Sequence, residues 1–123
     1  METTKNVWEI IADTLKEDGW DVYPPATKEG ECKSKYVVLK QDGSSQVGSF
    51  SSQFDYYMFL LYVPRNEYSK LGTYEKQLKD LLSKKLFPLL VPTGQKMTDY
   101  YDDNYKAHLR TILYRNSVRN KHL

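Results

Sequence analysis

The feature that most constrains this chain is the run from Phe54 to Pro64, which reads Phe-Asp-Tyr-Tyr-Met-Phe-Leu-Leu-Tyr-Val-Pro. It is too short to cross a membrane as a helix, and its aromatic residues favour a β-strand that ends at the proline. At the two-residue period of a strand, both of its faces are largely apolar. One face carries Phe54, Tyr56, Met58, Leu60 and Tyr62, and the other carries Asp55, Tyr57, Phe59, Leu61 and Val63.

A strand that is apolar on both faces needs a covering layer on each side. Helices of the same chain supply one layer, and a partner subunit is one supplier of the other. We therefore predict a subunit interface at this strand, in which either Tyr56 or Tyr57 faces away from the helices. The candidate contact residues are Phe54, Tyr56, Tyr57, Met58, Phe59 and Tyr62.

Composition narrows the class of protein. A chain of 123 residues suits one domain, and a net charge of +2 is too balanced for a general polyanion binder. The single cysteine, Cys32, excludes an internal disulfide and fits a reducing compartment. The N-terminus lacks the basic and apolar regions of a signal peptide. The 11 tyrosines suit either strands or a protein interface.

Two segments have the apolar spacing of amphipathic helices, residues 4–18 and 70–86. Thr3 or Thr4 is predicted to cap the first helix, and Gly19 is predicted to end it in a left-handed conformation. Strands are predicted at 35–40, 44–50, 54–64, 96–103 and 105–114, with a tight hairpin turn at Asp42-Gly43 and a mobile polar loop at 26–34.

This order, α-β-β-β-α-β, predicts an α+β fold. We expect a two-layer sandwich, in which a mainly antiparallel sheet of four to five strands has both helices on one face. The predicted domain spans residues 1–115, and residues 116–123 are predicted to form a basic C-terminal tail.

Basic residues gather near the C-terminus, where no acidic residue follows Tyr105. Arg110, Arg115, Arg119 and Lys121 are candidate contacts to a partner protein or to DNA. A small nucleic-acid-binding module and a merely solvated tail are the alternatives for this segment.

Catalytic patterns are scarce. The chain has no Gly-x-Ser-x-Gly elbow, no glycine-rich phosphate loop, and no metal-ligand spacing between His108 and His122. The acidic cluster Asp99, Asp102 and Asp103 is typical of a solvated loop tip. We therefore predict no enzymatic activity, no catalytic residue, no metal site and no cofactor.

One enzymatic alternative stays open. Asp21, Glu31 and Lys33 match the Asp…Glu-x-Lys arrangement of a metal-dependent nuclease family, in which two carboxylates hold magnesium and the lysine polarises a water molecule. Those nucleases place Glu-x-Lys on a core strand, whereas the neighbours here are Lys28, Glu29, Gly30 and Ser34.

The element order, the chain length and two strand sequences resemble the tail terminator and tail-to-head joining proteins of tailed bacteriophages. These sequences are the central strand ending in Tyr62-Val63-Pro64-Arg65 and the last strand from Leu109 to Asn116. The polar segment 26–34 departs from the pattern. The resemblance implies a small α+β subunit of a ring, usually hexameric, that stops growth of the tail tube and forms the surface to which the head docks.

The same resemblance implies partners and a location. The partners would be further copies of the chain, the tail tube protein and a head-completion or connector protein, with DNA passing through the ring. The protein would be made in the host cytoplasm and reside in the virion, in the neck region of the tail.

Overall fold

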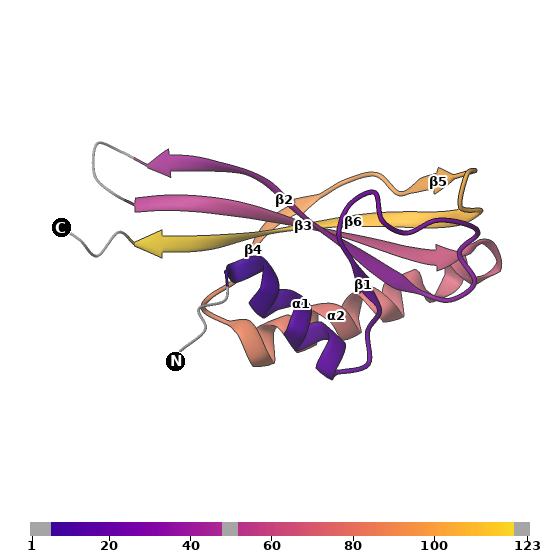
Figure 1. Cartoon of the computed structure of the whole chain (residues 1–123), viewed down its shortest axis with the longest axis horizontal. Coiled ribbons are helices and arrows are strands. Elements are labelled where there is room, and N and C mark those ends of the chain that lie inside the picture. The colour runs from indigo at the N-terminus through magenta and orange to yellow at the C-terminus, as the bar shows by residue number, and fades with distance from the viewer. Residues whose placement is uncertain (1–5, 48–51, 120–123) are drawn as a thin grey trace.

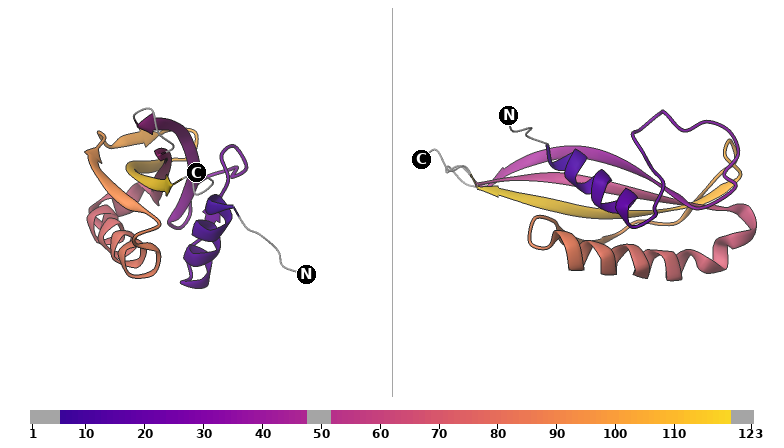
Figure 2. Two further views of the ribbon diagram at one scale, coloured as in Figure 1. Left: turned by 90° about the vertical axis from the view of Figure 1, so that its left-hand side faces the viewer. Right: turned by 60° about the horizontal axis from the view of Figure 1, so that its bottom comes forward.

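The computed structural model describes residues 6–47 and 52–119, which form a sheet of six strands with two α-helices beneath it (Figure 1). The elements are α1 (Val7–Glu17), β1 (Val22–Tyr23), β2 (Tyr36–Val47), β3 (Ser52–Pro64), η1 (Arg65–Lys70), α2 (Leu71–Leu86), β4 (Val91–Lys96), β5 (Tyr100–Asp102) and β6 (Ala107–Arg119). Both views in Figure 2 place α1 and α2 on the same side of the sheet. The predicted two-layer α+β class is confirmed.

The strand order is β1-β2-β3-β6-β4, and β5 also pairs with β6. Every pair is antiparallel except β1 with β2, which is parallel. The sheet is therefore mixed, and it has six strands where four to five were predicted. The parallel strand arises from the extended segment after α1, where Val22 pairs with Val37.

The main core lies between the sheet and the helices. Apolar residues of α1 and α2 pack there against alternate residues of β3, namely Tyr57, Phe59, Leu61 and Val63. The amphipathic spacing of both helices accounts for this layer. The first helix is capped by Asn6, whose side chain accepts a hydrogen bond from the Glu9 amide at 2.8 Å, and not by Thr3 or Thr4.

The hairpin predicted at Asp42-Gly43 is wrong. β2 continues through these residues, and its register with β3 shifts between Gln41 and Ser44. Gly43 has φ +91°, so its left-handed conformation makes a β-bulge and not a chain reversal. Residues 44–47, predicted to be a return strand, extend β2 instead.

The boundary predicted for the C-terminal tail is also wrong, because β6 extends to Arg119. Its last residues pair with β3 from Asn116, opposite Asp55, to Arg119, opposite Ser52. The side chain of Asn116 is 2% exposed, and its amide nitrogen donates a 2.7 Å hydrogen bond to the carbonyl of Leu89. Residues 116–119 are thus part of the sheet.

Three strand ends extend past the helices in Figure 1, at the left of the view. We call them the arm and define it as Ser44–Val47 of β2, Ser52–Asp55 of β3 and Asn116–Arg119 of β6. The three segments are in register, because Asp55 lies between Ser44 and Asn116, and Ser52 lies between Val47 and Arg119.

Candidate interaction surface

The face of the sheet away from the helices has two halves that differ in how they are covered. Near the carboxyl end of β3, the chain covers this face itself, through the irregular segment 24–35 and the turn before β6. We call the buried residues there the aromatic cluster: Cys32, Tyr36, Tyr62 and Ala107, with Tyr23, Val38, Leu60, Tyr105 and Leu109 packed against them.

Ring contacts hold the aromatic cluster together. Tyr36 stacks on Tyr62 with centroids 4.8 Å apart, and Tyr23 and Tyr105 approach this pair edge-on at 5.5 and 5.8 Å. The ammonium group of Lys28 lies 5.5 Å from the centroid of the Tyr36 ring, within cation–π range. Burial, above all, raises the pKa of both the Tyr36 and Tyr62 hydroxyls.

Two hydrogen bonds fasten the polar segment over this cluster. The Cys32 amide donates to the Tyr105 carbonyl at 2.8 Å, and the Tyr105 hydroxyl donates to the Lys28 carbonyl at 3.1 Å. The segment 26–34, predicted to be a mobile loop, therefore packs on the sheet. Burial raises the pKa of the Cys32 thiol to about 11, so this cysteine is a packing residue and a poor nucleophile.

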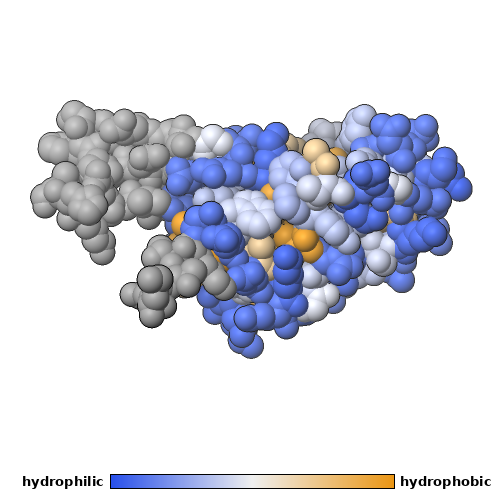
Figure 3. All heavy atoms as spheres, viewed as in Figure 1, coloured by the Kyte–Doolittle hydropathy of each residue, from blue (hydrophilic) through white to orange (hydrophobic). Residues whose placement is uncertain are grey.

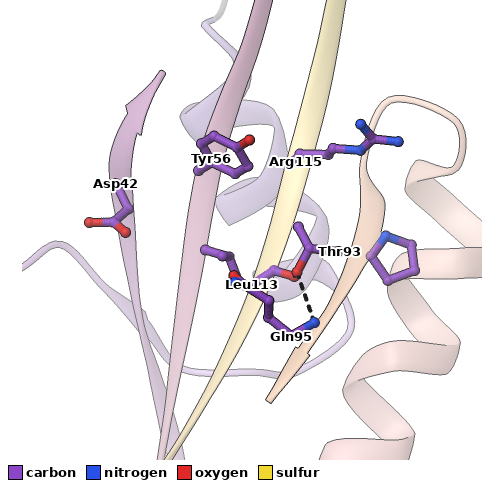
Figure 4. Close-up of a pocket in the computed structure, with 7 residues that line it drawn as sticks. Asp42, Tyr56, Thr93, Gln95, Leu113 and Arg115 are labelled. Atoms are coloured by element: carbon purple, nitrogen blue, oxygen red, sulfur yellow. Dashed lines mark hydrogen bonds between the residues drawn. The ribbon is translucent and has the colours of Figure 1, made fainter. Parts of the chain in front are cut away.

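The other half of the face is open and forms a hollow of about 640 Å³. Figure 4 shows side chains from four strands around it: Asp42 from β2, Tyr56 from β3, Thr93 and Gln95 from β4, and Leu113 and Arg115 from β6. The Thr93 hydroxyl donates to the Leu113 carbonyl at 2.9 Å and accepts from the Gln95 amide at 3.2 Å. We call this hollow the open pocket.

The predicted interface residues fall into different environments. Tyr56 faces away from the helices and lines the open pocket, and Met58 is half-buried on the same face. Tyr57 and Phe59, at 3% and 0% exposure, belong to the core beneath the sheet, so their assignment to the surface is corrected. Tyr62 is covered by the chain's own aromatic cluster. The side chain of Phe54 lies outside the described residues.

The predicted partner or DNA contacts are also separated. Arg110 is on the helix side, where its guanidinium donates to Asp99 at 2.8 and 2.7 Å and to Glu75 at 2.9 Å. It ties β6 to α2 and to the segment before β5, so it is corrected to a structural residue. Arg115 lines the open pocket. The side chain of Arg119 and the whole of Lys121 lie outside the described residues.

The ion pairs with Arg110 lower the pKa values of the two acidic side chains that take part in them. The Arg110 guanidinium, chiefly through its hydrogen bonds, lowers the pKa of Asp99. Burial alone would raise the pKa of Glu75, but hydrogen bonds from Lys79 and Arg110 outweigh it and lower that pKa. Asp99 is thus a paired carboxylate, and not part of a solvated loop tip as its acidic neighbours suggest.

The residues of the nuclease-like motif share one surface. Asp21, Glu31 and Lys33 line a pocket of about 390 Å³. Glu31 and Lys33 lie in irregular structure and not on a strand. Over residues 6–47 and 52–119, no group of three or more His, Cys, Asp or Glu side chains is arranged to hold a metal ion. His108 contacts the rings of both Tyr68 and Tyr101.

Sequence reasoning missed β4 and its contribution to the open pocket. Thr93-Gly94-Gln95 has the composition of a turn, and Pro92 argues against a strand. The available signal was the pair of β-branched residues Val91 and Thr93 around that proline, since prolines are tolerated on edge strands.

Most of the coloured surface on the face shown in Figure 3 is hydrophilic. Figure 3 shows a small apolar area near the middle of one face, bordered by hydrophilic residues. Within the part of the chain that the structure describes, no helix combines the length and apolarity needed to cross a membrane. No protein-family model matches the sequence, and no curated protein matches it.

Proposed function

We propose that the protein is a ring-forming structural subunit, a tail terminator that stops growth of a phage tail tube and joins the tail to the head. The observation that carries this proposal is the half-covered sheet face. The chain buries one half under its own segment 24–35 and leaves the other half as a pocket lined by Tyr56, Leu113 and Arg115.

The architecture supports an assembly role. A ring of identical subunits requires two different surfaces on each subunit, which meet head to tail. The open pocket and the projecting arm lie on different parts of the same three strands, so each subunit offers two distinct candidate contact surfaces (Figure 1). The resemblance in element order and strand sequence supplies the particular assembly: a ring at the head-proximal end of a tail.

The first test of the proposal is the molecular mass of the protein in solution. Light scattering over a concentration series should show a closed oligomer, and electron microscopy should show rings. The Tyr56→Asp variant should keep the fold and lose the ring, because the change removes the aromatic ring from the contact and requires a carboxylate to lose its hydration there. Tyr100→Asp is the matched control, since Tyr100 is 62% exposed on β5 and outside the open pocket.

A second test addresses the tail itself. Tubes assembled from the tail tube protein should elongate without limit when alone and should stop when the ring is added. A protein that remains monomeric at every concentration, or rings that neither cap tubes nor bind a head connector, would overturn the proposal.

The competing function is a metal-dependent nuclease, because Asp21, Glu31 and Lys33 line one pocket. Under the ring proposal, incubation with plasmid, single-stranded DNA or RNA in magnesium or manganese leaves the nucleic acid intact. Cleavage that co-purifies with the protein and disappears in Lys33→Ala would favour the nuclease.

A further inference from the structure

The arm has open backbone edges on both of its sides. β1 pairs with β2 only at Val37 and Val38, so among the described residues no strand pairs with the outer edge of β2 from Lys40 to Val47. On the opposite side, β4 reaches β6 only as far as Arg115, and within the same described residues no strand covers Asn116–Arg119.

Just before the unpaired edge of β2 begins, an outward-facing backbone group of this strand has a side-chain hydrogen-bond partner. The carbonyl of Leu39 points out of the sheet and accepts a 2.7 Å hydrogen bond from the indole nitrogen of Trp8. The side chain of Trp8, on α1, thus satisfies the outward-facing Leu39 carbonyl, which lies next to the core. Beyond it, the outward-facing amides and carbonyls of β2 are a template for another strand.

We infer that neighbouring copies pair edge to edge: the outer β2 edge Lys40–Val47 of one copy, which ends in its arm, pairs with the β6 edge Asn116–Arg119 in the arm of the next. This inference rests on the proposed ring and specifies its interface: a continuous sheet made from the arms, in addition to contacts at the open pocket.

Strand direction supports this pairing. β2 and β6 are each antiparallel to β3, so they run parallel to each other within one arm. In a ring, copies are related by rotation, and β6 of one copy would meet β2 of the next as a parallel pair. Each copy would then use both of its open edges, whereas a β2–β2 pair would leave the β6 edge open.

The charges of the two edge segments also favour the β2–β6 pair over a pair of two β6 edges. The β2 edge segment contains Lys40 and Asp42 and is neutral, whereas the segment from Arg115 to Arg119 contains two arginines and no acid. A β6–β6 pair would place two basic strands side by side, and like charges on neighbouring strands are destabilising. The β2–β6 pair avoids this repulsion.

Hydrogen exchange on the unmodified protein is the first test, with mass measured on the same samples. When the ring forms, peptides that cover 40–47 and 116–119 should gain protection relative to the dilute subunit. A ring without added protection in these peptides would overturn the edge pairing and leave the proposed ring standing. A monomer at every concentration would overturn both.

Cross-linking identifies which edges meet. A mixture of Gln41→Cys chains and Ser117→Cys chains should give dimers with a short thiol-reactive cross-linker, whereas either variant alone should not. The natural Cys32 is 2% exposed and serves as the background control in the unmodified chain. Dimers from Gln41→Cys alone would indicate a β2–β2 pair and would overturn the inference.

A backbone variant tests the hydrogen bonds themselves. Because outward groups alternate along a strand, the amide of Gln41 points outward like the carbonyl of Leu39, and Gln41→Pro removes that donor. Ring dissociation should then occur at a concentration about tenfold higher or more, as a partner carbonyl is left unpaired. Gln41→Ala keeps the amide and should assemble normally. Equal assembly of both folded variants would contradict the pairing.

Discussion

The aromatic cluster and the open pocket lie on the same face of the same three strands, yet the chain buries the β3 residues of the first more completely than those of the second. Tyr62 and Tyr56 occupy equivalent positions of the alternation along β3. Tyr62 is 8% exposed beneath the segment 24–35, whereas Tyr56 lines the open pocket. The alternation of a strand therefore determines which face a residue is on, and a distant irregular segment determines whether that face is covered.

The largest expected effect comes from breaking the covered half. Tyr62→Ala removes a ring that stacks on Tyr36 and packs against Tyr105, and it should lower the free energy of unfolding by about 3–5 kcal/mol. The matched change Tyr56→Ala should cost about 1 kcal/mol or less in the isolated subunit, since its side chain is only half-buried there. Urea denaturation under monomeric conditions measures both.

Equal losses at the two tyrosines would contradict this comparison. They would mean that the open pocket is packed as tightly as the aromatic cluster in the isolated subunit. A larger loss for Tyr56→Ala that appears only at concentrations where the protein assembles would instead place the missing cover in the neighbouring copy.

The next effect concerns the ion pairs of Arg110, which tie β6 to α2 on the helix side of the sheet. Arg110→Ala would leave Glu75 and Asp99, with side chains 12% and 23% exposed, without their shared cation. We expect a loss of about 2–3 kcal/mol in unfolding free energy. The control is Lys76→Ala, because the Lys76–Asp80 pair is 77% and 68% exposed and should contribute about 0.5 kcal/mol or less.

The same ion pairs predict that the free energy of unfolding depends on pH in the acid range. The pKa values of Asp99 and Glu75 are lowered in the folded protein, so their contribution is present above their unfolded values of about 4. It is lost as the pH falls below that range through the folded values, because protons then bind the unfolded chain more readily. Unfolding free energies measured from pH 6 downward should fall less steeply in Arg110→Ala than in the unmodified protein. Parallel pH profiles would rule out this contribution.

These two regions also show how far the sequence leads. The apolar alternation of residues 54–64 and the helical spacing of 70–86 predict β3, α2 and the two-layer class, because burial imposes a regular period on each element. Tyr56 and Arg115 were predicted as surface contacts and line the same pocket. Periodicity alone could not decide between Tyr56 and Tyr57, since both faces of that strand are apolar.

What the sequence did not predict depends on tertiary contacts. The polar segment 26–34 has no apolar period, yet Cys32 and its hydrogen bond to Tyr105 fasten it over the sheet. Arg110 has the same local signature as the other basic residues near the C-terminus. Only the packing of β6 beside α2 brings it to Glu75, a residue 35 positions away in the chain.

The smallest expected effect is at the start of the arm, where Gly43 forms the bulge in β2. A Cβ at this residue would meet no atom within 4 Å, so an alanine side chain would fit. Alanine is disfavoured there because the backbone φ is +91°, an angle that residues other than glycine rarely adopt. Gly43→Ala should therefore lower the unfolding free energy by about 1 kcal/mol. Gly72→Ala is the control of opposite sign, because Gly72 lies in α2 with ordinary backbone angles and equally open space, and alanine there should add about 0.5–1 kcal/mol.

Thermal melts of the two variants distinguish backbone strain from crowding. Similar losses in both would show that the added methyl group clashes, whereas a loss only at Gly43 would show that the left-handed backbone of the bulge is the constraint.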